Sequence, residues 1–387
     1  MLANRLMGKY AKFFVVVSAF IVLVSIAMLN RSNQRTSPAT PLKLSASSRE
    51  LDQDSTPLPF YPPGSAAALG NPAQTNDEWA AYLALKLPRE KIEEYLRLHN
   101  RNAASLLAAY HASGDADHPT GDIEYLKEAA RNFPNDPQVQ CTVLAQWNAL
   151  ETSAFPDDKR KWLDAFKASS PDNSLANYLS ASDYFQNNQP EAAIKEISEA
   201  SGKSSFGDFA MESFLGEEDL YRASGKSPLE ADRAAMAGAA GDLLPELASM
   251  KGIAQGVLAL KKQYLNSGDT ASAQNLSQMS LELADRLTGG DSGKLIISQL
   301  VGMSIQAISL QQLDQNTGYS FLGGETPAQR SQELKQQRAA LRELSQSFQS
   351  IAPTLSEAEM VSYAERAKIY GEAAAMRWLQ QQHPPNH

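Results

Sequence analysis

Two short stretches, FPNDP at 133–137 and SPDN at 170–173, decide the fold that this sequence predicts. In each, a proline ends one helical segment and polar residues suited to helix starts open the next. Pro134 and Pro171 are 37 positions apart, and an aromatic residue follows each proline at the same distance, Trp147 in one case and Tyr184 in the other. A period of this length with helical sequence between the junctions is typical of stacked helix pairs.

The clearest unit runs from Asp172 to Gly202. Its first helix carries a small residue, Ala181, three positions before the aromatic Tyr184. Its second helix carries small and large apolar residues in alternation: Ala193, Ile197 and Ala200. This unit resembles a tetratricopeptide repeat (TPR), in which small residues let two helices approach closely. The resemblance implies an all-α, right-handed α-solenoid of degenerate TPR-like hairpins.

Other units follow the pattern less closely. Ala129 and Ala273 fall in phase with the clearest unit, whereas larger or polar residues stand at positions that the family fills with small or apolar groups: Phe166, Lys261, Ser277 and Ser280. The competing interpretation is an irregular all-helical domain, because alanine-rich helices often match such spacing. Neither interpretation leaves room for a β-sheet, since runs of β-branched residues are almost confined to the N-terminus.

The resemblance also implies a binding surface. The first helices of stacked repeats line a concave face that binds a protein or peptide. The positions that correspond to this groove are Gln138, Cys141, Ala145 and Asn148 in one unit, and Leu175, Tyr178, Ser182, Phe185 and Gln186 in the next. For each of these residues the alternative is ordinary packing between repeats.

Composition narrows the class of partner. The chain of 387 residues has a formal net charge of −9 and a pI near 5.2, so it offers no general positive field for nucleic acid. Its one cysteine, Cys141, excludes an internal disulfide. The expected partner is therefore another protein or a peptide, with no nucleic acid and no small-molecule cofactor.

The N-terminus predicts a membrane anchor. Residues 1–12 carry basic side chains, and residues 13–29 form an uncharged apolar run that can just span a bilayer as a helix. The basic flank favours a cytoplasmic N-terminus, with the rest of the chain on the extracytoplasmic (periplasmic) side. The alternative is a cleaved signal peptide, for which residues 25–27 supply small side chains. Residues 30–75, rich in Pro, Ser and Thr, predict a disordered linker.

Beyond the linker the sequence is helical throughout. TPR-like repeats are expected in 76–226, and further helical hairpins, which could form a second TPR-like sub-array, in 227–382. The tail at 383–387 is expected to be disordered. Capping signals begin helices at Ser227, Thr326 and Ser356. The expected helices in this part span 228–242, 245–266, 270–287, 293–313, 327–351 and 357–381.

No catalytic or metal-binding motif is predicted. His111, Asp115, Asp117 and His118 are the only tight group of potential ligands, and their spacing fits an ordinary turn better than a zinc or calcium loop. Residues 288–295 resemble a phosphate loop but lack its first glycine and its hydroxyl residue. The leading hypothesis is a membrane-tethered scaffold without enzymatic activity. The alternatives are an exported all-helical enzyme acting on an envelope polymer and a self-assembling envelope component.

Overall fold

The computed structural model describes residues 86–114, 121–147, 155 and 158–384, and in these residues the protein is all-helical. The described part contains no strand, only one isolated bridge between Asn173 and Ser205. The prediction of an all-α fold is confirmed. The predicted anchor at 13–29, the linker at 30–75 and Asn148 lie outside the described residues.

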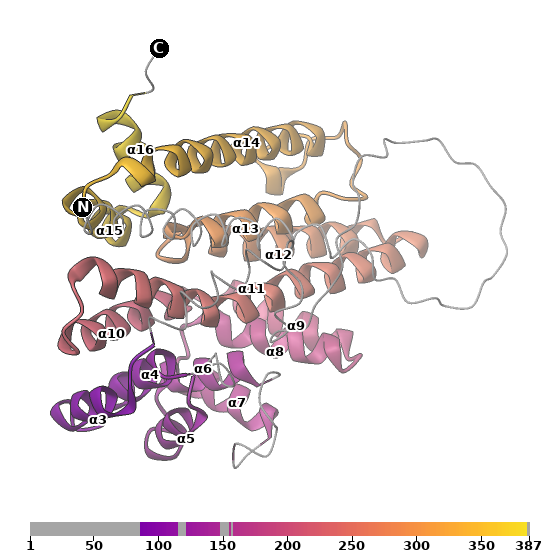
Figure 1. The fold of residues 1–387 in the computed structure, drawn as a ribbon. Helices are drawn as coiled ribbons and strands as arrows, with labels where there is room; N and C mark the ends of the chain where they lie inside the picture. Colours follow the sequence, from indigo (N-terminus) through magenta and orange to yellow (C-terminus); the bar gives the residue numbers. More distant parts are fainter. Residues whose placement is uncertain (1–85, 115–120, 148–154, 156–157, 385–387) are drawn as a thin grey trace, which may run out of the picture.

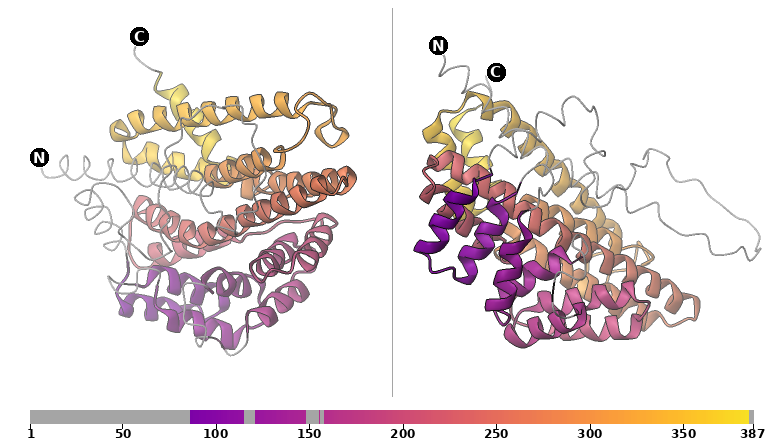
Figure 2. Two further views of the ribbon diagram at one scale, coloured as in Figure 1. Left: turned by 90° about the vertical axis from the view of Figure 1, so that its right-hand side faces the viewer. Right: turned by 60° about the horizontal axis from the view of Figure 1, so that its bottom comes forward.

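The helices form three layers in chain order (Figures 1 and 2). The N-terminal layer contains α3 (Arg89–Leu98), α4 (Ala103–Ala112), α5 (Ile123–Asn132), α6 (Pro137–Gln146), α7 (Lys159–Ser169), α8 (Ser174–Gln186) and α9 (Pro190–Ser201). The central layer contains α10 (Ala210–Ala223), α11 (Pro228–Asn266), α12 (Thr270–Thr288) and α13 (Ile296–Ser309). The C-terminal layer contains α14 (Pro327–Ile351), α15 (Glu357–Tyr370) and α16 (Glu372–Gln382). Short 3-10 turns occur at Ser292–Lys294, Ser320–Leu322 and Ala352–Thr354.

Local sequence explains where most helices begin. Asp136 accepts hydrogen bonds from the backbone amides of Gln138 and Val139, and Asn173 accepts one from Leu175, so both proline junctions end in side-chain caps. The predicted capping boxes are present at Ser227, Thr326 and Ser356. These contacts satisfy amides that the first helical turn leaves without acceptors.

Each helix of the N-terminal layer packs on the next one along the chain. The pair expected between Asp172 and Gly202 is present as α8 and α9, and its small residues Ala181, Ala193 and Ala200 are buried between helices. After α9 the chain returns to its beginning, because α10 packs on α4.

Helix α11 crosses the molecule from one end to the other. It is a single helix of 39 residues, whereas the sequence predicted two helices separated near Pro245. That prediction was wrong because a proline inside a helix removes one backbone hydrogen bond but can be offset by packing. Leu243, Leu247 and Met250 are all buried around this point.

A second boundary also differs. The helix predicted over 357–381 is divided at Gly371, whose φ of 88° is one that glycine adopts easily. A Cβ at this position would lie 3.0 Å from backbone atoms of Lys294, which belongs to the 3-10 turn in front of α13. The close approach of this turn therefore requires glycine. In front of α13, the predicted helix start at 293 is a 3-10 turn.

Both ends of α13 contact charged side chains from other helices. Glu372 accepts a hydrogen bond from the amide of Ile296 at 2.7 Å, and Lys261 donates to the carbonyls of Ser309 and Gln311 at 3.0 and 2.6 Å. A negative charge at the start and a positive charge at the end complement the helix dipole. Burial nevertheless lowers the pKa of Lys261 to about 8.

The last helices pack as the apolar stripes predicted. The ring of Phe348 on α14 stacks on Tyr363 of α15 with centroids 4.8 Å apart. His383, predicted to belong to a disordered tail, lies 3.0 Å from Glu359 through Nε2 and Oε1. None of the described helices is both long and apolar enough to cross a bilayer.

Candidate functional site

Most of the predicted groove faces the interior of the protein. Helix α11 packs along α4, α6 and α8, which are every second helix of the N-terminal layer. Of the predicted groove residues, Cys141, Ala145, Leu175, Tyr178 and Ser182 are buried, Gln138 and Phe185 are half-buried, and Gln186 is exposed. The position expected to hold a partner is occupied by other helices of the same chain.

Three contacts show how the helices of the central layer cover this face. The Cys141 thiol lies 2.8 Å from the Glu246 carboxylate of α11, and the amide of Gln138 donates to Ser213 of α10 at 3.2 Å. Phe185 packs so closely on Gly256 of α11 that a Cβ there would lie 2.9 Å from its ring.

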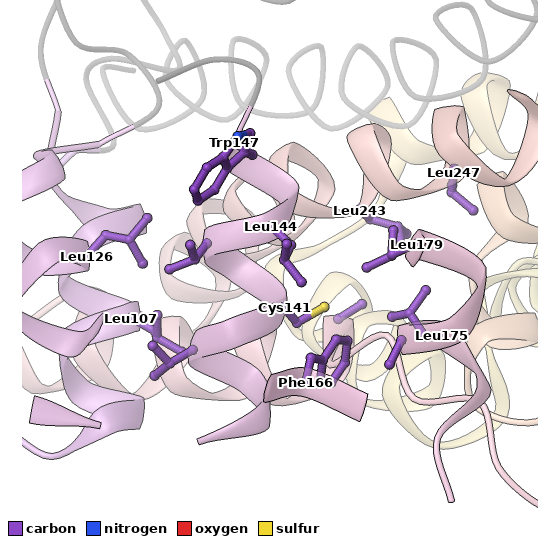
Figure 3. Close-up of a cluster of buried hydrophobic side chains, with 14 of the residues drawn as sticks. Leu107, Leu126, Cys141, Leu144, Trp147, Phe166, Leu175, Leu179, Leu243 and Leu247 are labelled. Atoms are coloured by element: carbon purple, nitrogen blue, oxygen red, sulfur yellow. The ribbon is translucent and has the colours of Figure 1, made fainter. Parts of the chain in front are cut away.

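The contact between α8 and α11 is mainly apolar. Leu175 and Leu179 of α8 belong to the same buried cluster as Leu243 and Leu247 of α11 (Figure 3). Burial of four leucine side chains contributes roughly 1.5 to 3 kcal/mol each. The predicted groove is therefore part of the core in this arrangement.

Tyr178, expected to contact a peptide, packs instead on Phe206, with ring centroids 6.3 Å apart. Its hydroxyl is buried without a hydrogen-bond partner among the described residues, and this burial raises its pKa far above the usual value. Such a phenol is held for its apolar ring, and it is out of reach of a ligand.

Sequence reasoning missed a cluster of charges at the junction of α10, α11 and α15. The Lys368 ammonium lies 2.7 Å from Glu218, 2.9 Å from Asp232 and 2.9 Å from Glu365. Arg222 forms a further ion pair with Glu218. We call these five residues the Lys368 cluster.

Burial decides the electrostatics of the Lys368 cluster. Asp232 is completely buried, and this raises its pKa to about 6 although the attraction of Lys368 opposes the shift. Burial alone would lower the pKa of Lys368, but its hydrogen bonds to the carboxylates outweigh that effect and raise it. The lysine therefore stays charged at neutral pH.

The three carboxylates of this cluster have a spacing that could hold a metal ion, since one oxygen of each lies within 4.8 Å of the others. The Lys368 ammonium already binds all three. A divalent cation would have to displace it, and Asp232 offers no exposed surface to a substrate. The arrangement is suited to joining helices.

No local pattern could have revealed the Lys368 cluster. Glu218 and Arg222 are one helical turn apart, as are Glu365 and Lys368, and each pair alone is typical of a solvated helix surface. The contact between Glu218 and Lys368 joins residues 150 positions apart.

A surface cavity of about 230 Å³ lies between α12 and α14. It is lined by Leu281, Asp285, Phe321, Leu322, Glu325 and Arg330. Burial raises the pKa of Asp285, which accepts a hydrogen bond from Gln306 at 3.2 Å. Arg330 binds Glu333 at 3.1 Å and Gln306 at 3.3 Å. We call this the α12/α14 pocket.

The charges of the α12/α14 pocket favour a cation. Its two carboxylates exceed its one guanidinium, which is already shared with Glu333 outside the lining. Three apolar side chains, Leu281, Phe321 and Leu322, provide the rest of the lining. A pocket of this kind can take an apolar side chain next to a basic one.

Two further candidates from the sequence analysis remain, a group of potential metal ligands and a stretch that resembles a phosphate loop. His111 is buried, and Asp115, Asp117 and His118 lie outside the described residues. The stretch 288–295, which resembles a phosphate loop, forms the end of α12 and the 3-10 turn before α13.

The chain matches no protein-family model, no curated protein and no solved structure.

Proposed function

We propose that this protein is a membrane-tethered helical scaffold that binds a protein or peptide partner outside the cytoplasm. The N-terminal segment 13–29 would be the anchor and 30–75 the linker. The N-terminal layer would be a short TPR-like solenoid, a proposal supported by the consecutive packing of α3 to α9 and by the small buried residues of α8 and α9.

The observation that carries the binding proposal is the α12/α14 pocket. Because α11 covers the predicted groove, a partner needs another surface, and this pocket combines apolar side chains with excess negative charge. We infer that the partner segment carries an apolar side chain beside a lysine or arginine. An ionic contact at this exposed site would add modest affinity and more selectivity.

Site-directed photocrosslinking tests this proposal. The full chain, with a photoreactive residue in place of Leu322, is expressed in the organism that produces the protein. The crosslinked products are then identified. The expected result is a discrete adduct that disappears when Phe321 is changed to Ala or Glu325 to Lys, because both substitutions act at the lining.

The control is Arg342→Gln, which changes an exposed residue of the same helix α14 away from the pocket. Circular dichroism and the Tm show whether each variant is folded. An adduct that persists in both lining variants, or the absence of any adduct with folded protein, contradicts the proposal. Extracytoplasmic location is tested separately by cysteine accessibility at a residue engineered into the linker.

A further inference from the structure

The α12/α14 pocket contains opposite charges that do not pair with each other. Asp285 of α12 and Arg330 of α14 both line it, but among the described residues the ion pair of Arg330 is with Glu333 and not with Asp285. Burial raises the pKa of Asp285, and the positive charge of Arg330 acts in the opposite direction. The two groups are therefore close enough to attract each other and are nevertheless held apart.

The side chain of Gln306 on α13 lies between these two charges. It is buried, its Nε2 donates to Oδ1 of Asp285 at 3.2 Å, and its Oε1 accepts from Nη2 of Arg330 at 3.3 Å. A carboxylate only accepts hydrogen bonds and a guanidinium only donates them, so the amide fits in one orientation. Gln306 thus joins an acid and a base through a neutral group.

Helix stability does not explain where these charges stand. Asp285 lies in the last turn of α12, and Arg330 lies in the first turn of α14. An acid near the C-terminus of a helix and a base near the N-terminus both oppose the helix dipole. A direct ion pair would offset this cost, but the contact with Gln306 takes its place. Oδ2 of Asp285, which is an exposed residue, has no hydrogen-bond partner among the described residues.

We propose that Gln306 is a positioning residue of the α12/α14 pocket, which keeps Arg330 away from Asp285 and so leaves the Asp285 carboxylate available to the basic group of a partner. This inference rests on the proposed function, and it assigns the basic group to one of the two carboxylates. Without the amide, Arg330 would turn to Asp285 and neutralise it. The pocket would then lose the excess negative charge that selects a cation.

The first experiment needs no partner. The carboxyl carbon of Asp285 is titrated by NMR in the full chain in detergent, and its signal is assigned by its loss in Asp285→Asn. Gln306→Met removes both polar ends of the side chain at nearly constant volume. We expect a lower pKa of Asp285 in this variant, because a charged donor, Arg330, replaces a neutral one. If Gln306 only fills space, the loss of its hydrogen bond raises the pKa instead.

The matched control is Gln299→Met on the same helix. The amide of Gln299 donates to the carbonyl of Gly293, outside the pocket lining, so this variant should leave the pKa of Asp285 unchanged. Circular dichroism and the Tm show whether each variant is folded. If Gln306→Met does not fold, Gln306→Asn replaces it, because its shorter side chain cannot reach both partners. A pKa of Asp285 that is unchanged or raised in the folded variant overturns the proposal.

The second experiment uses the crosslinked adduct at Leu322. Gln306→Met should lower its yield about threefold, as expected for the loss of an exposed ionic contact. Adding Arg330→Met should restore the yield, by a larger factor than Arg330→Met produces in the wild type. Equal factors in the two backgrounds would reject the role of Gln306.

The two experiments separate this inference from the proposed function. A raised pKa of Asp285 in Gln306→Met, together with a wild-type adduct, rejects the role of Gln306 and leaves the proposed binding site standing. A lowered pKa without any wild-type adduct rejects the partner and its contact with Asp285, whereas the separation of the two charges by Gln306 stands.

Discussion

The two ends of helix α11 are held by different forces. Near its beginning, Asp232 is tied to α10 and α15 through the Lys368 cluster. Towards its end, Gly256 lies against the ring of Phe185 on α8, in an apolar contact. Ionic contacts depend on pH and on partner charges, whereas apolar packing depends on shape and volume. The same helix should therefore respond to different perturbations at each end.

The largest effect is expected at the charged end. Lys368→Met leaves three carboxylates close together with only Arg222 nearby, and we expect a loss of about 3 to 5 kcal/mol in the free energy of unfolding, measured with urea. The exposed control Lys335→Met should change it by less than about 0.5 kcal/mol. A loss no larger than that of the control would show that the cluster does not stabilise the fold.

The same variant should acquire a new property. Without the ammonium, the three carboxylate oxygens within 4.8 Å of one another match the ligands of calcium. Calcium at millimolar concentration is expected to raise the Tm of Lys368→Met and not that of the wild type. Equal responses of the two proteins would mean that the carboxylates separate when the lysine is lost.

A third prediction concerns pH. The pKa of Asp232 is about 6 in the folded protein and about 3.9 in an unfolded chain, so the folded state binds the proton more strongly between these values. The stability that this stronger proton binding by Asp232 contributes is fully present below about pH 4 and is lost as the pH rises through 6. The wild type should therefore gain up to about 3 kcal/mol over Asp232→Asn between pH 7 and pH 4. A stability difference independent of pH would reject this assignment.

The apolar end is tested by two glycines one turn apart. Gly256→Ala places a methyl group against Phe185 and should cost about 1 to 2 kcal/mol in net stability. Gly252 has open space around it, so Gly252→Ala should stabilise the helix by about 0.5 to 1 kcal/mol. The same sign of change in both variants would show that α11 does not pack on α8 in this way.

The smallest effect is expected at the rim of the Lys368 cluster. The Arg222 side chain is 43% exposed, and surface ion pairs contribute little. Arg222→Gln should lower the unfolding free energy by less than about 1 kcal/mol, measured beside Lys368→Met. A loss as large as that of Lys368→Met would mean that charge number rather than burial governs this junction.

Features of the fold that depend on residues close together in the sequence were predicted correctly. The caps at Ser227, Thr326 and Ser356 and the bounds of α14 follow from residues within one turn. The continuous α11 was missed because the packing around Pro245 comes from distant helices. The Lys368 cluster and the covering of the groove were missed for the same reason.

The position of α11 in the sequence affects how the chain folds during its synthesis. The helices that it covers are synthesised first, and roughly 50 more residues must follow α9 before Gly256 is made. At a synthesis rate of about 5 to 20 residues per second this takes roughly 3 to 10 seconds. During that interval the leucines of α8 would be exposed to water, so a nascent chain stalled before α11 should aggregate or recruit a chaperone.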